Sequence, residues 1–141
     1  MMHKDADGVW RRVAFPGFTY MKGISGFGRS TLWFWGQGVY RWNQEAQGPL
    51  EDITSTSPFP WGSSTLPWDR GPSEIRNVWV ARPTDLWILS KRGDVYHWRE
   101  EADGTVTAVQ SRVPPSGAAQ DGFLELTSIW GASSTDVWAA G

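Results

Sequence analysis

The sequence contains no cysteine, so disulfide bonds and thiolate metal sites are excluded. No apolar run approaches the ~20 residues that a membrane-spanning helix needs. Residues 1–5 include no apolar segment, so we expect no signal peptide in this chain. These absences do not assign a cellular compartment, because many secreted bacterial proteins also lack cysteine.

Positive charge is also scarce: 13 Lys and Arg residues stand against 15 Asp and Glu residues, for a formal net charge of −2. Because phosphate binding needs a concentrated positive face, we expect neither nucleic acid nor a membrane as a partner. The motifs Gly-x-Ser-x-Gly, His-Glu-x-x-His and the P-loop are absent. Residues 5–8 resemble part of a calcium loop, but few acids follow them, which favours a hairpin turn. We therefore expect a protein that is not an enzyme and has no catalytic residues, metal or cofactor.

Aromatic residues and turn formers are abundant instead. The 141 residues include 11 tryptophans, 16 glycines and 9 prolines. Aromatic side chains favour strands, whereas glycine and proline favour turns. No segment shows a sustained helical period, so the composition predicts an all-β protein of many short strands.

An internal repeat is the main signal in the sequence. Residues 75–87 align without a gap on residues 126–138, which matches Trp79, Asp85 and Trp87 with Trp130, Asp136 and Trp138. A third copy over residues 23–33 keeps the same spacing, although Ser25 replaces the first Trp and Thr31 replaces the Asp. A position that recurs in successive repeats usually serves the repeat. We therefore expect the Asp to cap its turn and Trp33, Trp87 and Trp138 to be buried between repeats.

Each copy continues with a tight turn and two further strands. Residues 38–42 match 93–98 with one insertion, and residues 48–53 match 104–109. The last copy ends after two strands, and residues 1–13 resemble the two that are missing, with His3 aligned on His97. We expect a single domain over residues 1–141, with repeats at approximately 14–53, 54–109, and 110–141 plus 1–13.

Four antiparallel strands in roughly 50 residues, repeated along the chain, predict a β-propeller. We expect three four-stranded antiparallel blades per chain, one of them closed by strands from both termini. Because propellers typically have 4–8 blades, three blades need a partner. That partner is a second copy, giving a homodimer with six blades, or the missing blades of a longer chain. The whole number of repeats favours the homodimer.

Two segments carry a resemblance to known proteins. Residues 130–141 read Trp-Gly-Ala-Ser-Ser-Thr-Asp-Val-Trp-Ala-Ala-Gly, and residues 93–98 read Gly-Asp-Val-Tyr-His-Trp. The pattern resembles Trp-rich propeller repeats of bacterial surface proteins, W-G-S-S-x-x-D-V-W-A-x-G followed by G-x-V-x-H-W. It is loosely similar to the Asp-box hairpins of sialidases and propeller lectins, but lacks their Gly-x-Thr-Trp ending. The resemblance implies a propeller fold and a secreted or cell-surface bacterial parent protein. It implies no activity, because propellers host many unrelated ones.

The connection over residues 54–74 is the most informative segment outside the repeat. It contains Phe59, Trp61, Trp68, Asp69 and Arg70. Aromatic faces beside polar groups suit a sugar ring or a peptide, so these five residues are the candidate ligand-binding site. Packing of the aromatics over a blade edge is the alternative interpretation, and it is the one that we favour. The next connection, residues 113–122, has no aromatic residue, so the repeat itself does not require them.

Three functions compete. The first is a non-catalytic, lectin-like binding or interaction module with a carbohydrate or protein ligand, assembled into a complete propeller. The second is a purely structural propeller segment of a larger bacterial surface protein. The third is a glycosidase-like propeller enzyme, which needs paired carboxylates near the central axis. The acids of this chain fall mostly in turns, so the sequence favours the first function.

Overall fold

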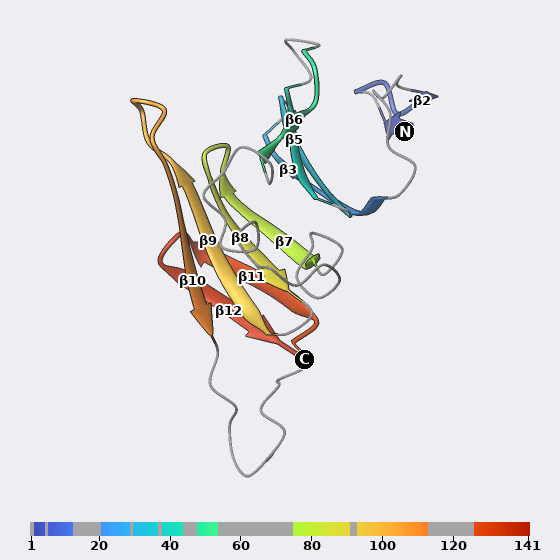
Figure 1. The fold of residues 1–141 in the computed structure, drawn as a ribbon. Coiled ribbons are helices and arrows are strands. Elements are labelled where there is room, and N and C mark those ends of the chain that lie inside the picture. Colours follow the sequence, from blue (N-terminus) through green and yellow to red (C-terminus); the bar gives the residue numbers. More distant parts are fainter. Residues whose placement is uncertain are drawn as a thin grey trace.

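The fold is known from a computed structural model, which describes residues 2–4, 6–12, 21–28, 30–36, 38–43, 48–53, 75–90, 93–112 and 126–141. These residues form β-strands in four antiparallel sheets and no helical element (Figure 1). The predicted all-β class is confirmed. Within the described residues, no helix is long and apolar enough to cross a membrane.

Twelve strands make up the sheets, and they are β1 (Met2–Lys4), β2 (Trp10–Arg12), β3 (Met21–Phe27), β4 (Thr31–Gly36), β5 (Val39–Asn43), β6 (Glu51–Asp52), β7 (Ile75–Arg82), β8 (Asp85–Ser90), β9 (Asp94–Glu100), β10 (Val106–Arg112), β11 (Ser128–Ser133) and β12 (Asp136–Ala140). Every pairing joins two strands that follow each other in the sequence.

Two of the sheets have four strands. We call β3-β4-β5-β6 the first sheet and β7-β8-β9-β10 the central sheet. The second strand of each is a nearly continuous apolar run whose residues are almost all buried. Such a run is typical of a strand that is covered on both faces, so β4 and β8 form where the sequence predicts them.

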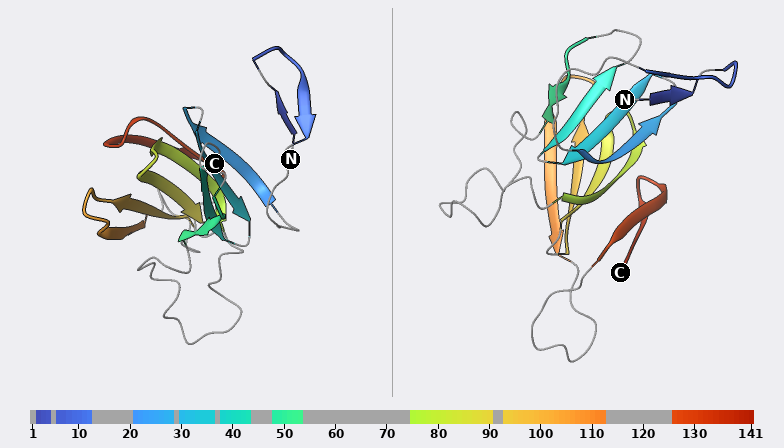
Figure 2. Two further views of the ribbon diagram at one scale, coloured as in Figure 1. Left: turned by 90° about the horizontal axis from the view of Figure 1, so that it is seen from above. Right: turned by 90° about the vertical axis from the view of Figure 1, so that its right-hand side faces the viewer.

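The other two sheets are the N-terminal hairpin, β1–β2, and the C-terminal hairpin, β11–β12. The predicted third four-stranded sheet, closed by strands from both termini, does not form within the chain. The reason is the stacking order: the first sheet packs on one face of the central sheet and the C-terminal hairpin on the other. The N-terminal hairpin precedes the first sheet, and the two hairpins lie far apart in both views of Figure 2.

Two apolar clusters hold this stack together. The larger lies between the first and central sheets and includes Trp33 and Trp98, whose rings meet edge to face with centroids 5.6 Å apart. The smaller joins Leu89 and Val95 of the central sheet to Leu126 and Ile129 beside and within β11. The central sheet is therefore covered on both faces, but by four strands on one and two strands on the other.

The C-terminal hairpin repeats the pairing of β7 with β8. Trp130 lies opposite Trp138 as Trp79 lies opposite Trp87. A shift in register precedes the turn in both pairs, so that Ser133 meets Asp136 as Arg82 meets Asp85. The aligned sequences therefore fold alike strand for strand.

The N-terminal hairpin likewise repeats the pairing of β9 with β10. Lys4 lies opposite Trp10 as Glu100 lies opposite Val106, across turns of equal length. Gly8 and Gly104 have φ angles of 83° and 82°, a left-handed conformation that glycine adopts without strain. This register corrects one alignment: His3 corresponds to Arg99 and not to His97.

The three recurring tryptophans differ in burial. Trp33 is fully buried and Trp87 is half-buried, whereas Trp138 is 67% exposed. The predicted burial is confirmed for Trp33 and is wrong for Trp138 in the single chain. The cause is the stacking order, since within the described residues no sheet covers the outer face of β12.

Candidate functional site: a groove beside the C-terminal hairpin

The five residues predicted to bind a ligand, Phe59, Trp61, Trp68, Asp69 and Arg70, lie outside the described residues. The structure therefore does not place that site. The described surface holds a different feature, a groove between the central sheet and the C-terminal hairpin.

The groove has a volume of about 580 Å³. Its wall on the central sheet is made by Trp87, Val95, His97 and Ser111. Its wall on the C-terminal hairpin is made by Ile129, Ser134, Thr135, Val137, Trp138 and Ala139. Both walls are mainly apolar with a few hydroxyl and imidazole groups, which suits the side chains of a protein segment.

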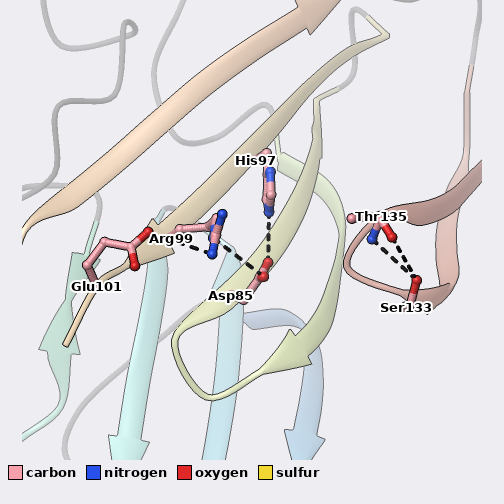
Figure 3. Close-up of polar contacts among 6 residues, drawn as sticks. All are labelled: Asp85, His97, Arg99, Glu101, Ser133 and Thr135. Atoms are coloured by element: carbon pink, nitrogen blue, oxygen red, sulfur yellow. Dashed lines mark hydrogen bonds and ion pairs between the residues drawn. The ribbon is translucent and has the colours of Figure 1, made fainter.

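A polar cluster of β8 and β9 borders the groove (Figure 3). His97 Nε2 lies 2.8 Å from Asp85 Oδ1, and Arg99 Nε lies 3.8 Å from Asp85 Oδ2. Glu101 approaches the other side of the Arg99 guanidinium, at 3.7 Å. The sequence predicted that Asp85 caps its turn. The structure directs its buried carboxylate to His97 and Arg99 on the next strand.

His97 also stacks on a tryptophan. Its ring lies flat on that of Trp87, with centroids 4.0 Å apart and planes 6° apart. Asp85 fixes the imidazole from one end while Trp87 supports its face, so the side chain has a defined orientation at the groove wall. Trp87 and His97 lie directly opposite each other in the pairing of β8 with β9.

The first sheet contains the same arrangement with a different side chain. Arg41 is paired with Trp33 across β4 and β5, as His97 is with Trp87. Its guanidinium carbon lies 5.6 Å from the Trp33 ring centroid and 5.8 Å from that of Trp98. Each of these two sheets thus places a nitrogen-bearing planar group over its recurring tryptophan.

Arg41 also links the first sheet to the central sheet. It lies 2.8 Å from Glu51 on β6 and forms an ion pair with Glu100 on β9. Burial lowers the pKa of the guanidinium, but its hydrogen bonds to Glu100 and Glu51 and the negative charges of these carboxylates together outweigh burial, so the pKa is raised. Arg41 is therefore a charged contact between sheets, beside a smaller pocket of about 360 Å³.

Sequence reasoning missed that Arg41 and His97 form one recurring arrangement with Trp33 and Trp87. The signal was present, because Tyr40-Arg41-Trp42 and Tyr96-His97-Trp98 align in the repeat. What the alignment did not show is that this middle residue lies opposite the recurring Trp of the preceding strand.

Exposed aromatic side chains gather on the C-terminal hairpin. Trp130 and Trp138 are both largely exposed, and the Trp138 indole Nε1 donates a hydrogen bond of 3.0 Å to Asp136 Oδ1. The turn of this hairpin is organised by Ser133, whose Oγ accepts a hydrogen bond from the backbone N–H of Thr135 at 3.4 Å. A surface with two exposed tryptophans beside an apolar groove is typical of an interaction site.

No protein-family model, no curated protein and no solved structure matches this chain. Among the described residues, no three His, Asp or Glu side chains lie close enough together to hold a metal ion.

Proposed function

We propose that the chain is a non-catalytic interaction module of the β-propeller type. In this proposal the first and central sheets are complete blades, and the two hairpins are the halves of a third. The observation that carries it is the shared pairing: β11–β12 repeats β7–β8, and β1–β2 repeats β9–β10. The stacking of consecutive sheets face to face also supports it.

Association is the first activity of such a module. Propellers close with 4–8 blades, so three repeats leave two end faces that need neighbours. Trp130 and Trp138 are exposed on one terminal face, and Ile24 of β3 is exposed on the opposite end of the stack. Apolar surfaces of this kind mark sites of protein contact.

Light scattering of the purified chain at low concentration tests the proposal. We expect a mass near twice the 15.8 kDa of one chain, since two copies supply six blades. A variant with Trp130→Ser and Trp138→Ser should shift toward the monomer. A folded and stable monomer of the unaltered chain would contradict self-association, and would favour the blades of a longer chain as the partner.

Ligand binding is a second proposed activity, favoured by the aromatic connection over residues 54–74. Trp61 and Trp68 lie in this connection, whereas the equivalent connection has no aromatic residue. If the ligand is a carbohydrate, we expect the chain to bind on a glycan array and a Trp61→Ala, Trp68→Ala variant to lose this binding. If the ligand is a protein, we expect the same variant to lose binding to a peptide. An assembly that binds neither would favour the purely structural function. Turnover of synthetic glycosides would favour the glycosidase-like enzyme.

A further inference from the structure

The edge of β12 that faces away from β11 lies next to an uncovered part of the central sheet. Within the described residues, β12 pairs only with β11. Beside it, Val109 of β10 is 59% exposed on the face of the central sheet that points toward the C-terminal hairpin. An unpaired strand edge next to exposed apolar surface is a template for another strand.

The opposite face of the central sheet shows what covers such a surface. There the four strands of the first sheet extend over β9 and β10, and Val106 and Ala108 pack against the shared core. On the groove side, the C-terminal hairpin has only two strands, and its apolar contacts lie with Trp79, Trp87, Leu89 and Val95. Two further strands beyond β12 would make the two faces equivalent.

We infer that the N-terminal hairpin of a second copy supplies these two strands. Its β1 pairs antiparallel with β12, and its β2 lies outermost, over the groove. This inference rests on the proposed function and adds to it the partner, the strand and the register.

The register follows from the pairing of β8 with β9. Val137 corresponds to Leu86, which lies opposite Trp98, and Met2 corresponds to Trp98. Met2 of the second copy therefore lies opposite Val137. By the same correspondence, His3 lies opposite Asp136, as Arg99 lies opposite Asp85.

The side chains of the hairpin suit this place. Met2 is 57% exposed and Trp10 is 61% exposed, and they occupy the positions of Trp98 and Val106. Trp98 is buried and Val106 partly buried, because both face the neighbouring sheet. In the inferred register Met2 and Trp10 face the groove, so two exposed apolar side chains of one copy cover apolar surface of the other.

Charge supports the same register. In the central sheet, the side chains of His97 and Arg99 on β9 contact the Asp85 carboxylate. Asp136 is its counterpart on β12, and the strand inferred to pair with it contains His3 and Lys4. The pairing thus places the His3 imidazole opposite an exposed carboxylate, where the central sheet has Arg99 opposite Asp85.

A second copy fits better than the chain's own hairpin. Within one chain the two hairpins lie on opposite sides of the stack of sheets (Figure 2), and three blades are too few to close a ring. Two copies that exchange hairpins form a closed two-fold assembly with six four-stranded sheets and no open edge at β12.

Disulfide trapping tests the inference, because the chain has no cysteine of its own. Two variants, Met2→Cys and Val137→Cys, are made separately with tags of different mass, mixed and oxidised. Opposed residues of an antiparallel pair lie within disulfide range. We expect the mixed disulfide to accumulate at least tenfold over either homodisulfide. The matched control replaces Met2→Cys by Trp10→Cys, which lies on β2, one strand away from β12, and should give no mixed product.

The outcomes separate the inference from the proposed function. An assembly of twice the chain mass that forms the mixed disulfide supports both. An assembly of that mass without the mixed disulfide overturns the inferred register and leaves the interaction module in place. A monomer overturns the inference and self-association, and leaves the blades of a longer chain as the partner of the module. A disulfide that forms only within single chains of a Met2→Cys, Val137→Cys double variant overturns the exchange between copies.

Discussion

The central sheet and the two terminal hairpins contain the same pairing pattern but differ in what surrounds them. Trp87 is half-buried under His97, whereas its counterpart Trp138 is exposed. The Asp85 carboxylate is buried against His97, whereas Asp136 is exposed and accepts from the Trp138 indole. Strand pairing therefore depends on the local sequence, while the burial of the same positions depends on the neighbouring sheet.

Replacing the recurring tryptophans should give the largest difference in the free energy of unfolding between the buried and the exposed position. Trp33→Ala should lower the free energy of unfolding by about 3–5 kcal/mol, because this ring is fully buried against Trp98. Trp138→Ala should change the unfolding of the single chain by less than about 0.5 kcal/mol, as at other exposed sites. Urea denaturation at several protein concentrations measures both. Equal losses at the two positions would contradict the comparison.

Replacing the recurring aspartates, Asp85 and Asp136, should give the next largest difference in stability. Asp85→Ala removes the buried partner of His97 and should cost about 1–3 kcal/mol. Asp136→Ala, the matched change in the C-terminal hairpin, should cost far less because the carboxylate is exposed. Thermal unfolding of the two variants checks this, and the comparison fails if Asp136→Ala is the more damaging.

Gly131 tests how closely the C-terminal hairpin contacts the central sheet. A Cβ at this position would lie 2.6 Å from the Trp79 ring and 2.8 Å from the carbonyl oxygen of Asp136. Gly131→Ala should therefore destabilise the chain by about 1–3 kcal/mol, the usual cost of overpacking. Gly48→Ala is the control, because a Cβ there meets nothing within 4 Å. A neutral Gly131→Ala would show that the hairpin is not packed on Trp79.

A smaller effect is expected from the charge pair inferred between copies. Asp136→Lys should weaken association by up to about fivefold, since an exposed ion pair contributes about 0.2–1 kcal/mol. Adding His3→Asp should restore the affinity, because a carboxylate then lies opposite the new ammonium group. Sedimentation at several concentrations gives the dissociation constants. A double variant no tighter than Asp136→Lys alone would contradict the pairing of these residues.

The smallest effect concerns the turn between β9 and β10. The backbone N–H of Thr105 donates a 2.8 Å hydrogen bond to Asp103, which lowers the pKa of this carboxyl. The stability that it contributes is therefore present above the unfolded pKa of about 3.9 and is lost as the pH falls through the lower folded pKa. Asp103→Asn should flatten the acid limb of the stability profile slightly. Parallel profiles for the two proteins would rule out this contribution.

Much of the fold could be predicted from the sequence because its signals are local. Continuous apolar runs, Gly turns and the repeat predict β4, β8 and the strands of the two hairpins, and all of them form. The correspondence between residues 126–138 and 75–87 also predicts the pairing of Trp130 with Trp138. These features depend on contacts between neighbouring strands, which a repeat conserves within one chain.

The rest depends on contacts between sheets, which the repeat pattern does not encode. The exposure of Trp138 follows from the stacking order, and the contact of Arg41 with Glu100 joins residues of different repeats. The alignment of His3 on His97 was wrong by two positions, because the β1–β2 turn length, and not residue identity, decides the register. The predicted ligand-binding residues lie outside the described residues, so that site stays a prediction.

The order of the strand pairs also has a consequence for folding kinetics. Because every described pairing joins strands adjacent in the sequence, each sheet closes only short loops and can form quickly, before the sheets pack on one another. The inferred pairing of β12 with β1 of a second copy is the exception, since it is bimolecular. Refolding should therefore show a fast phase that is independent of protein concentration, followed by a slower phase whose rate rises with concentration.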